Sequence, residues 1–140
     1  MRLFYTDGAC KGNPGPGGWG VVEIIGGAVA HTFGGGETDT TNNRMELQAA
    51  IGALLATEQG SEVTIVTDSN YVKNGITAWI TGWKRNGWKS ASGSPVKNKD
   101  LWLQLDQIAA ARRVTWRWVK GHSSDAFNEA ADATANRHVP

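Results

Sequence analysis

Cysteine is nearly absent from this chain, since Cys10 is the only one among 140 residues. A single thiol excludes an intrachain disulfide and any zinc site built from several thiolates. Long apolar runs are also missing, and residues 1–5 lead straight into a strand pattern, which argues against a signal peptide or a membrane helix. We therefore expect a cytoplasmic protein with a reduced thiol and no membrane partner.

Acidic residues are missing from one long segment. Between Asp68 and Asp100 there is no acid, although six basic residues lie there, so this segment carries +6 and the rest of the chain −5. Trp79, Trp83 and Trp88 fall in the same segment. Cations suit phosphates and flat aromatic faces suit sugars and bases, so this composition favours nucleic-acid binding. Two alternatives stay open: a basic run is often a solvated surface, and the i,i+4 spacing of Trp79 and Trp83 is also typical of a core.

Repeats, low-complexity tracts and linkers are absent, so we expect one domain over residues 1–140. Apolar periodicity and turn residues predict five strands. The chain pattern also predicts helices, one of which is either continuous or broken at Gly75. It leads into a projecting loop that has a helical start and ends near Ser94. The predicted strands cover residues 2–7, 18–25, 28–34, 63–67 and 114–119, and the predicted helices lie between Asn43 and Gly60 and over 69–80, 101–111 and 125–137. These elements indicate an α/β fold with a mixed sheet that has helices on both faces.

Two aspartates lie at the ends of predicted strands. Asp7 ends the first strand and Asp68 ends the fourth. If these strands are parallel neighbours, both side chains emerge at one carboxyl edge, where open α/β folds place their chemistry. Glu46 and Asp132 would then approach on helices. Clustered carboxylates repel one another unless divalent cations neutralise them, so this pattern points to metal-dependent phosphate chemistry.

Each acid has an ordinary structural alternative. Asp7 before a glycine is compatible with a turn, and Asp68 with an N-cap of the helix that follows. Asn43 and Glu46 have the spacing of a capping box at a helix start. Asp132 alone is typical of a solvated helix position. The metal site is favoured only when the four acids are taken together.

Several longer motifs carry a resemblance to a known family. Residues 6–18, 41–47, 67–69, 119–122 and 128–132 resemble ribonuclease HI, the bacterial type 1 ribonuclease H, and residues 75–98 are similar to that family's basic protrusion. The resemblance covers nearly the whole chain. It implies a five-stranded sheet of order 3-2-1-4-5 and endonucleolytic cleavage of the RNA strand of RNA/DNA hybrids. It also implies two Mg²⁺ ions, with Mn²⁺ as an alternative, 3′-hydroxyl and 5′-phosphate products, and no sequence specificity. Apart from the resemblance, we expect a monomer that needs no protein partner, because nothing in the sequence marks a large apolar interface.

The resemblance also implies roles for individual residues. Asp7, Glu46, Asp68 and Asp132 match the catalytic acids that bind metal, and His122 matches a loop histidine that assists proton transfer or product departure. Substrate positions fall into four groups: Asn13, Asn42 and Asn43 near the RNA backbone, Thr41 and Asn98 at a DNA phosphate, Tyr71 and Trp83 along the DNA strand, and Lys84, Arg85, Trp88 and Lys89 on the protrusion.

Two other functions remain open at this point. A transposase or integrase core also gathers acids on a similar sheet, although residues 41–46 and the tryptophan-bearing protrusion favour the hybrid nuclease. A hybrid-binding module without catalysis is the alternative from another class. Four intact acids argue against it, because carboxylates repel phosphates and would only weaken binding.

Overall fold

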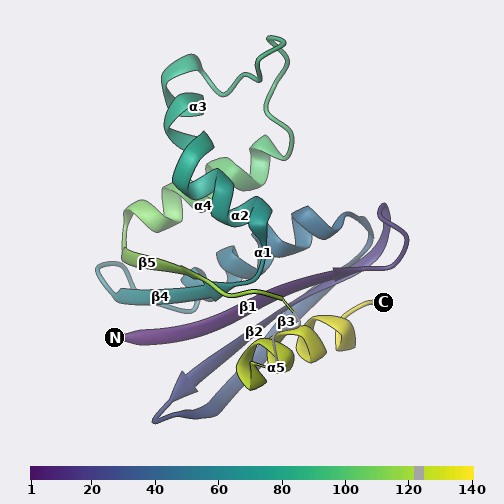
Figure 1. Cartoon of the computed structure of the whole chain (residues 1–140), viewed down its shortest axis with the longest axis vertical. Coiled ribbons are helices and arrows are strands. Elements are labelled where there is room, and N and C mark those ends of the chain that lie inside the picture. Colours follow the sequence, from purple (N-terminus) through teal and green to yellow (C-terminus); the bar gives the residue numbers. More distant parts are fainter. Residues whose placement is uncertain (122–124) are drawn as a thin grey trace.

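A five-stranded mixed sheet forms the centre of the molecule. The computed structural model describes residues 1–121 and 125–140. The strands lie in the order β3-β2-β1-β4-β5, as predicted (Figure 1). β1 pairs antiparallel with β2 and parallel with β4, β2 pairs antiparallel with β3, and β5 pairs parallel with β4. Their bounds are β1 (Arg2–Cys10), β2 (Gly15–Ile25), β3 (Ala28–Thr40), β4 (Glu62–Thr67) and β5 (Arg113–Trp118).

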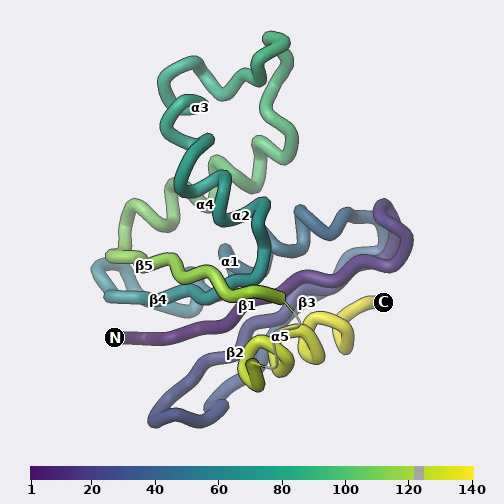
Figure 2. Tube along the Cα trace, viewed as in Figure 1, coloured from purple at the N-terminus to yellow at the C-terminus, as the bar shows by residue number. Residues whose placement is uncertain are grey.

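Helices cover both faces of this sheet, as predicted. One face carries α1 (Asn42–Leu55) and α4 (Lys99–Ala110), and the opposite face carries α5 (Ala126–Arg137) (Figures 1 and 2). A second group of helical segments comes after β4, and these segments succeed one another without a break. They are α2 (Asn70–Asn74), the π-helical segment η1 (Gly75–Trp79) and α3 (Ile80–Asn86). We refer to residues 80–98 as the protrusion, because α3 and the chain after it project away from the sheet (Figure 1).

The side-chain alternation of the strands explains the two layers. Phe4, Val21 and Ile65 point to the side of α1 and α4, and they belong to a core cluster that includes Leu47, Leu54, Trp102 and Leu105. The neighbouring residues Tyr5, Val22 and Val66 point to the other side, where Ala131 of α5 covers them. Because successive residues of a strand face opposite ways, a strand such as residues 63–66, which is apolar except for Thr64, supplies both cores.

Three predicted strand boundaries were wrong by three residues or more: β1 and β3 extend to Cys10 and Thr40, and β2 begins at Gly15 instead of Gly18. The helical chain after β4 runs through Ile80 to Asn86, which agrees with the helical start expected for the projecting loop. Gly75 does not break this helix. A side chain there would collide with the ring of Trp102, since an added Cβ would lie 2.0 Å from Trp102 Cη2. This glycine therefore serves close packing, and the helix stops at Gly87, whose φ of 78° is left-handed.

Two helix caps also differ from the structural alternatives considered for the acids. Thr41, and not Asn43, caps α1, because its Oγ1 accepts a hydrogen bond from Arg44 N at 3.2 Å. Ser69, and not Asp68, caps α2 through a 3.1 Å hydrogen bond from Val72 N. Glu46 and Asp68 are therefore not needed as caps, which leaves their carboxylates available for another role.

Within residues 1–121 and 125–140, no helix combines the length and the apolar character that a membrane crossing requires.

Candidate active site

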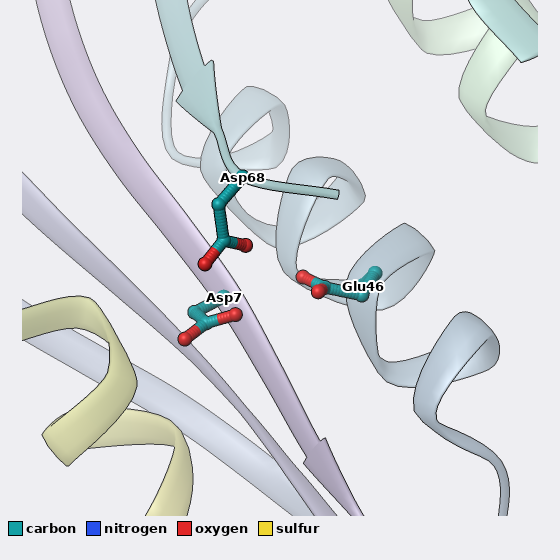
Figure 3. A group of neighbouring side chains, drawn as sticks. All are labelled: Asp7, Glu46 and Asp68. Atoms are coloured by element: carbon teal, nitrogen blue, oxygen red, sulfur yellow. The ribbon is translucent and has the colours of Figure 1, made fainter. Parts of the chain in front are cut away.

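Three carboxylates meet at the carboxyl edge of the central strands. Asp7 lies on β1, Asp68 follows β4, and Glu46 lies on α1, and all three side chains point toward a common centre (Figure 3). Each offers an oxygen such that these atoms all lie within 4.8 Å of one another. The parallel pairing of β1 with β4 brings the two aspartates together, as the sequence predicted.

Glu46 reaches this group because Gly8 allows α1 to approach β1 closely. A Cβ added to Gly8 would lie 2.6 Å from Glu46 N and 2.7 Å from Met45 C. Any side chain at this position would therefore push the first turns of the helix away from the strand. Glu46 is only 6% exposed and Asp7 5% exposed, so both carboxyl groups are buried at the helix–strand contact.

Asp132 joins the cluster from the opposite side of the sheet. It lies on α5 and lines the same cleft as the other three acids, and Asn136 Nδ2 donates a hydrogen bond to its Oδ1 at 3.3 Å. Asn128, one turn earlier, is buried and directs Nδ2 to Asp68 Oδ2 at 3.5 Å. One face of α5 therefore contributes both an acid and an amide. We call Asp7, Glu46, Asp68 and Asp132 the acidic centre.

Burial and mutual repulsion perturb the ionisation of this centre. Burial is the main cause that raises the pKa of Asp7 to about 8, and the neighbouring charges of Asp68 and Asp132 raise it further. Burial also raises the pKa of Glu46 well above its ordinary range, with the charges of Asp7 and Asp68 as additional causes. Both shifts describe carboxylates that lack a compensating positive charge.

The donor set fits hard divalent cations. Glu46 Oε1 is buried and, among the described residues, has no hydrogen-bond partner. Carboxylate oxygens are preferred ligands of Mg²⁺, and a cation between these acids would satisfy the buried oxygen and relieve the repulsion.

A cleft of about 620 Å³ opens over the acidic centre. Asn42, Asn43 and Tyr71, to which substrate roles were assigned, line this cleft. Asn13 is held nearby, because its Oδ1 accepts a 2.8 Å hydrogen bond from Asn42 N. The wall of the cleft therefore presents neutral amides and one phenol next to the acids.

Thr41 and Asn98 lie in a hydrogen-bonded network beside this cleft. Asn98 directs Oδ1 toward Arg44 at 3.3 Å and Nδ2 toward the Tyr71 hydroxyl at 3.2 Å. Arg44 also forms a two-fold ion pair with Asp100, with contacts of 2.9 and 2.8 Å, and this guanidinium lowers the pKa of the Asp100 carboxyl. Thr41, three residues before Arg44, caps the same helix.

The remaining predicted substrate residues lie in the protrusion, away from the lining of the cleft. Trp83 packs between Trp88 and Trp102, with ring centroids at 6.0 and 5.4 Å, so both predicted ring residues also support the local fold. Lys84, Arg85 and Lys89 are exposed, and Lys84 pairs with Asp106 at 3.5 Å. His122 lies outside the described residues.

The contacts of three site residues were not predicted from the sequence. Gly8 admits the helix that carries Glu46, Asn128 contacts Asp68, and Arg44 connects Asn98 to Asp100. For Asn128 a signal existed, because it precedes Asp132 by four residues and residues four apart share one helix face. The other two depend on contacts between distant segments.

Comparison with known proteins gives a consistent picture. A family model described as RNase H matches residues 2–139. The chain is 58% identical to the ribonuclease H of Marinobacter nauticus, over 98% of this chain and 92% of that protein. It is 61% identical to the ribonuclease H of Cereibacter sphaeroides, over 94% of this chain and 89% of that protein.

Solved structures show the same arrangement of elements. The crystal structure of LC9-RNase H1, described as a type 1 RNase H with the type 2 active-site motif, has a TM-score of 0.82 and 35% identity, over 99% of this chain and 71% of that one. LC11-RNase H1 in complex with RNA/DNA hybrid has a TM-score of 0.74 and 23% identity, over 99% of this chain and 96% of that one, and supports the fold alone.

Proposed function

Because this chain belongs to the ribonuclease H family of endoribonucleases, we propose that it hydrolyses the RNA strand of RNA/DNA hybrids by a two-metal-ion mechanism. The observation that carries this proposal is the acidic centre, in which oxygens of Asp7, Glu46 and Asp68 lie within 4.8 Å of one another. Asp132 completes the set from α5. The products are RNA fragments with 3′-hydroxyl and 5′-phosphate ends.

The acids hold the divalent ions, with Mg²⁺ as the natural choice and Mn²⁺ as an alternative. When bound, such ions supply an activated water and neutralise the charge on the departing 3′ oxygen. Glu46 brings a buried oxygen that has no other partner among the described residues, so its burial is most easily explained by cation binding. Asn128 keeps Asp68 oriented from the side of α5. His122 serves as the group that moves a proton or assists product departure.

Recognition of the RNA strand falls to the amides on the cleft wall. Asn42 and Asn43 line the cleft next to Glu46, and Asn13 is fixed to the main chain of Asn42. Neutral donors and acceptors are suited to 2′-hydroxyl groups, which distinguish RNA from DNA across a shallow minor groove. None of these residues reads base edges, so cleavage is independent of sequence.

The DNA strand binds along Tyr71 and Trp83, and other side chains hold these two rings in place. The Tyr71 hydroxyl accepts hydrogen bonds from Trp102 Nε1 at 2.8 Å and from Asn98 Nδ2 at 3.2 Å. Its acceptor sites are therefore filled, and its own proton remains available for a substrate oxygen. Thr41 and Asn98 bind a DNA phosphate beside Arg44. Trp88 and the exposed cations Lys84, Arg85 and Lys89 extend this contact along the protrusion.

One assay tests the proposal. RNA/DNA, DNA/DNA and RNA/RNA duplexes of one sequence, labelled on both strands, are incubated with the protein and Mg²⁺. We expect cuts only in the RNA of the hybrid, no cuts after chelation, and fragments whose 5′ ends can be ligated without prior phosphorylation. The protein acts in the cytoplasm as a single-domain monomer, so the specific activity is expected to be independent of protein concentration.

The other outcomes point to the competing functions. Joining of DNA ends would identify a strand-transfer enzyme, and a gel shift without cuts would identify a binding module. Cleavage that continues in the presence of a chelator would contradict the metal mechanism while leaving the substrate class intact.

A further inference from the structure

A lysine and a tryptophan form a pair at the edge of the sheet that carries the acidic centre. Lys73 lies on α2 and Trp118 is the last residue of β5. The Lys73 ammonium lies 4.7 Å from the centroid of the Trp118 ring. Trp118 Nε1 in turn donates a hydrogen bond to the main-chain oxygen of Asp68 at 3.2 Å. The Lys73 ammonium therefore lies on the Trp118 ring, and this ring is hydrogen-bonded to the main chain of Asp68 in the acidic centre.

The pair is more exposed than a structural contact requires. Trp118 remains 39% exposed in spite of its size, and Lys73 is exposed. Among residues 1–121 and 125–140, none of the four ion pairs involves Lys73. This ammonium therefore keeps its charge and hydrogen-bond donors available for a ligand.

The surroundings indicate which ligand fits. The hollow next to the pair, lined by Ile76, Thr77 and Trp116 among others, measures about 120 Å³. Pockets for small molecules are several times larger, about 300–1,000 Å³, so a free metabolite or cofactor is a poor match. A cation beside a flat aromatic face suits a sugar-phosphate backbone instead.

We infer that Lys73 and Trp118 form a contact for a backbone phosphate of the substrate, next to the linkage that is cleaved. This inference rests on the proposed function. Lys73 binds the phosphate, and Trp118 holds Lys73 in place while its indole N–H fixes the main chain of Asp68. The position of the phosphate contact is thereby fixed relative to the acidic centre. The contact is separate from the protrusion. Its two residues belong to α2 and to the end of β5, next to the sheet, whereas the protrusion projects away from the sheet (Figure 1).

Steady-state cleavage of a hybrid at several salt concentrations tests this contact. Lys73→Met removes the charge and keeps the length of the side chain, and Lys73→Arg keeps the charge. We expect Lys73→Met to raise KM about fivefold with kcat within about twofold, and to reduce the salt slope of log(kcat/KM) by about one phosphate contact. Lys73→Arg should restore both values. Trp118→Phe keeps a ring and removes the N–H, so it should lower kcat more than it raises KM.

Arg113→Met is the matched control. Arg113 begins β5, at the opposite end of this strand from Trp118, and pairs with Glu62 at 3.5 Å, so its loss lowers the net charge equally without touching the proposed contact. We expect its KM and salt slope to equal those of the wild type. If Lys73→Met and Arg113→Met behave alike, or if Lys73→Met lowers kcat at unchanged KM, the contact is refuted. Failure of the wild type to cut hybrids would instead refute the proposed function itself.

Discussion

Burial of several carboxylates in one place has an energetic consequence for the metal-free protein. Asp7 and Glu46 are both buried, and burial together with neighbouring charges raises the pKa of each. In the unfolded chain these groups ionise at ordinary pH values near 4. In the folded chain they hold their protons to higher pH. Folding therefore favours the protonated form, and the stability of the folded state falls as pH rises from the ordinary pKa to the raised pKa of each group.

We predict that the metal-free protein loses stability as pH rises. For Asp7 the window runs from its ordinary pKa of 3.8 to about 8. Between these values the folded state binds a proton that the unfolded state has released, so the free energy of unfolding falls by up to about 1.4 kcal/mol per pH unit for one such group. Thermal unfolding in a chelator should show a lower Tm at pH 8 than at pH 5.5.

Mg²⁺ and a neutral variant provide the controls for this prediction. Mg²⁺ should raise Tm more at pH 8 than at pH 5.5, because the ionised carboxylates bind it better. Asp7→Asn should remove part of the pH dependence and stabilise the metal-free protein at pH 8. A Tm in chelator that rises from pH 5.5 to pH 8 would show that ionisation of the acidic centre does not destabilise the metal-free protein.

Removal of single site residues should separate metal binding from proton transfer. Asp7→Asn removes a charge at the centre of the cluster and should reduce kcat for hybrid cleavage about a thousandfold or more. His122→Ala should reduce it about a hundredfold, because general acid–base assistance is only part of the rate enhancement. Single-turnover cleavage with both variants measures the difference. Equal losses would mean that the two roles are misassigned.

Local chemistry at a single residue could be predicted only in part. The four acids were identified because each follows a strand or fits a family motif. The residues that cap the helices were not identified. Thr41 and Asn43 offer similar oxygens at the start of α1, and Asp68 and Ser69 do so at the start of α2. Which oxygen binds depends on the entry angle of the chain into the helix, and sequence spacing does not determine that angle.

At the scale of elements, two glycines decide how closely the helices approach the sheet. Gly8 of β1 lies against α1, which carries Glu46, and Gly20 of β2 lies against α5, which carries Asp132. A Cβ on Gly20 would lie 2.5 Å from Ala135 N and 2.8 Å from Ala131 O. Since these contacts are with backbone atoms, a side chain could be accommodated only by a shift of the whole helix.

We therefore predict that Gly8→Ala impairs catalysis by displacing α1. The added methyl group meets Glu46 N and should move the helix by a fraction of an ångström or more. Misplacement on the order of 1 Å at a catalytic centre can cost about a hundredfold in rate, and overpacking costs about 1–3 kcal/mol of stability. The measurements are kcat for hybrid cleavage and the free energy of unfolding in urea.

Gly82→Ala is the matched control for this substitution. Gly82 lies within α3, and a Cβ there would meet nothing within 4 Å. Alanine in an open helical position should stabilise by about 0.5–1 kcal/mol and leave kcat unchanged. If Gly8→Ala behaves in the same way, the close approach of α1 is not what positions Glu46.

Helix continuity was harder to predict than helix existence. A break at Gly75 in the helix after β4 was left open, because glycine is a poor helix former. In the structure the chain stays helical through Gly75, and the missing side chain gives room to Trp102, which is 27 positions later in the sequence. A glycine selected for packing looks the same in the sequence as one selected to end a helix, so only the tertiary contact distinguishes them.

At the scale of the whole molecule, charge of opposite sign occupies two different regions. The acidic centre lies at the carboxyl edge of β1 and β4, whereas the protrusion carries four basic residues and no acidic one. The order of the sheet followed from the family resemblance, and the two charge regions from the residue pattern. The ion pairs that reduce individual charges, such as that of Lys84 with Asp106, were not predictable because their partners lie on separate helices.

This pairing predicts unequal contributions of the protrusion cations to substrate binding. Lys89 is exposed and belongs to none of the ion pairs found in the described part of the chain, whereas Lys84 lies 3.5 Å from Asp106. Each free cation that contacts a phosphate should contribute about 0.9 to the slope of log affinity against log salt. Lys89→Gln should therefore reduce the slope by close to that amount, and Lys84→Gln by clearly less. Affinity of the inactive Asp7→Asn protein for a hybrid, measured by fluorescence anisotropy between 50 and 200 mM salt, gives both slopes. If the two substitutions reduce the slope equally, Asp106 does not neutralise Lys84 in solution, and the protrusion binds the substrate through its total charge alone.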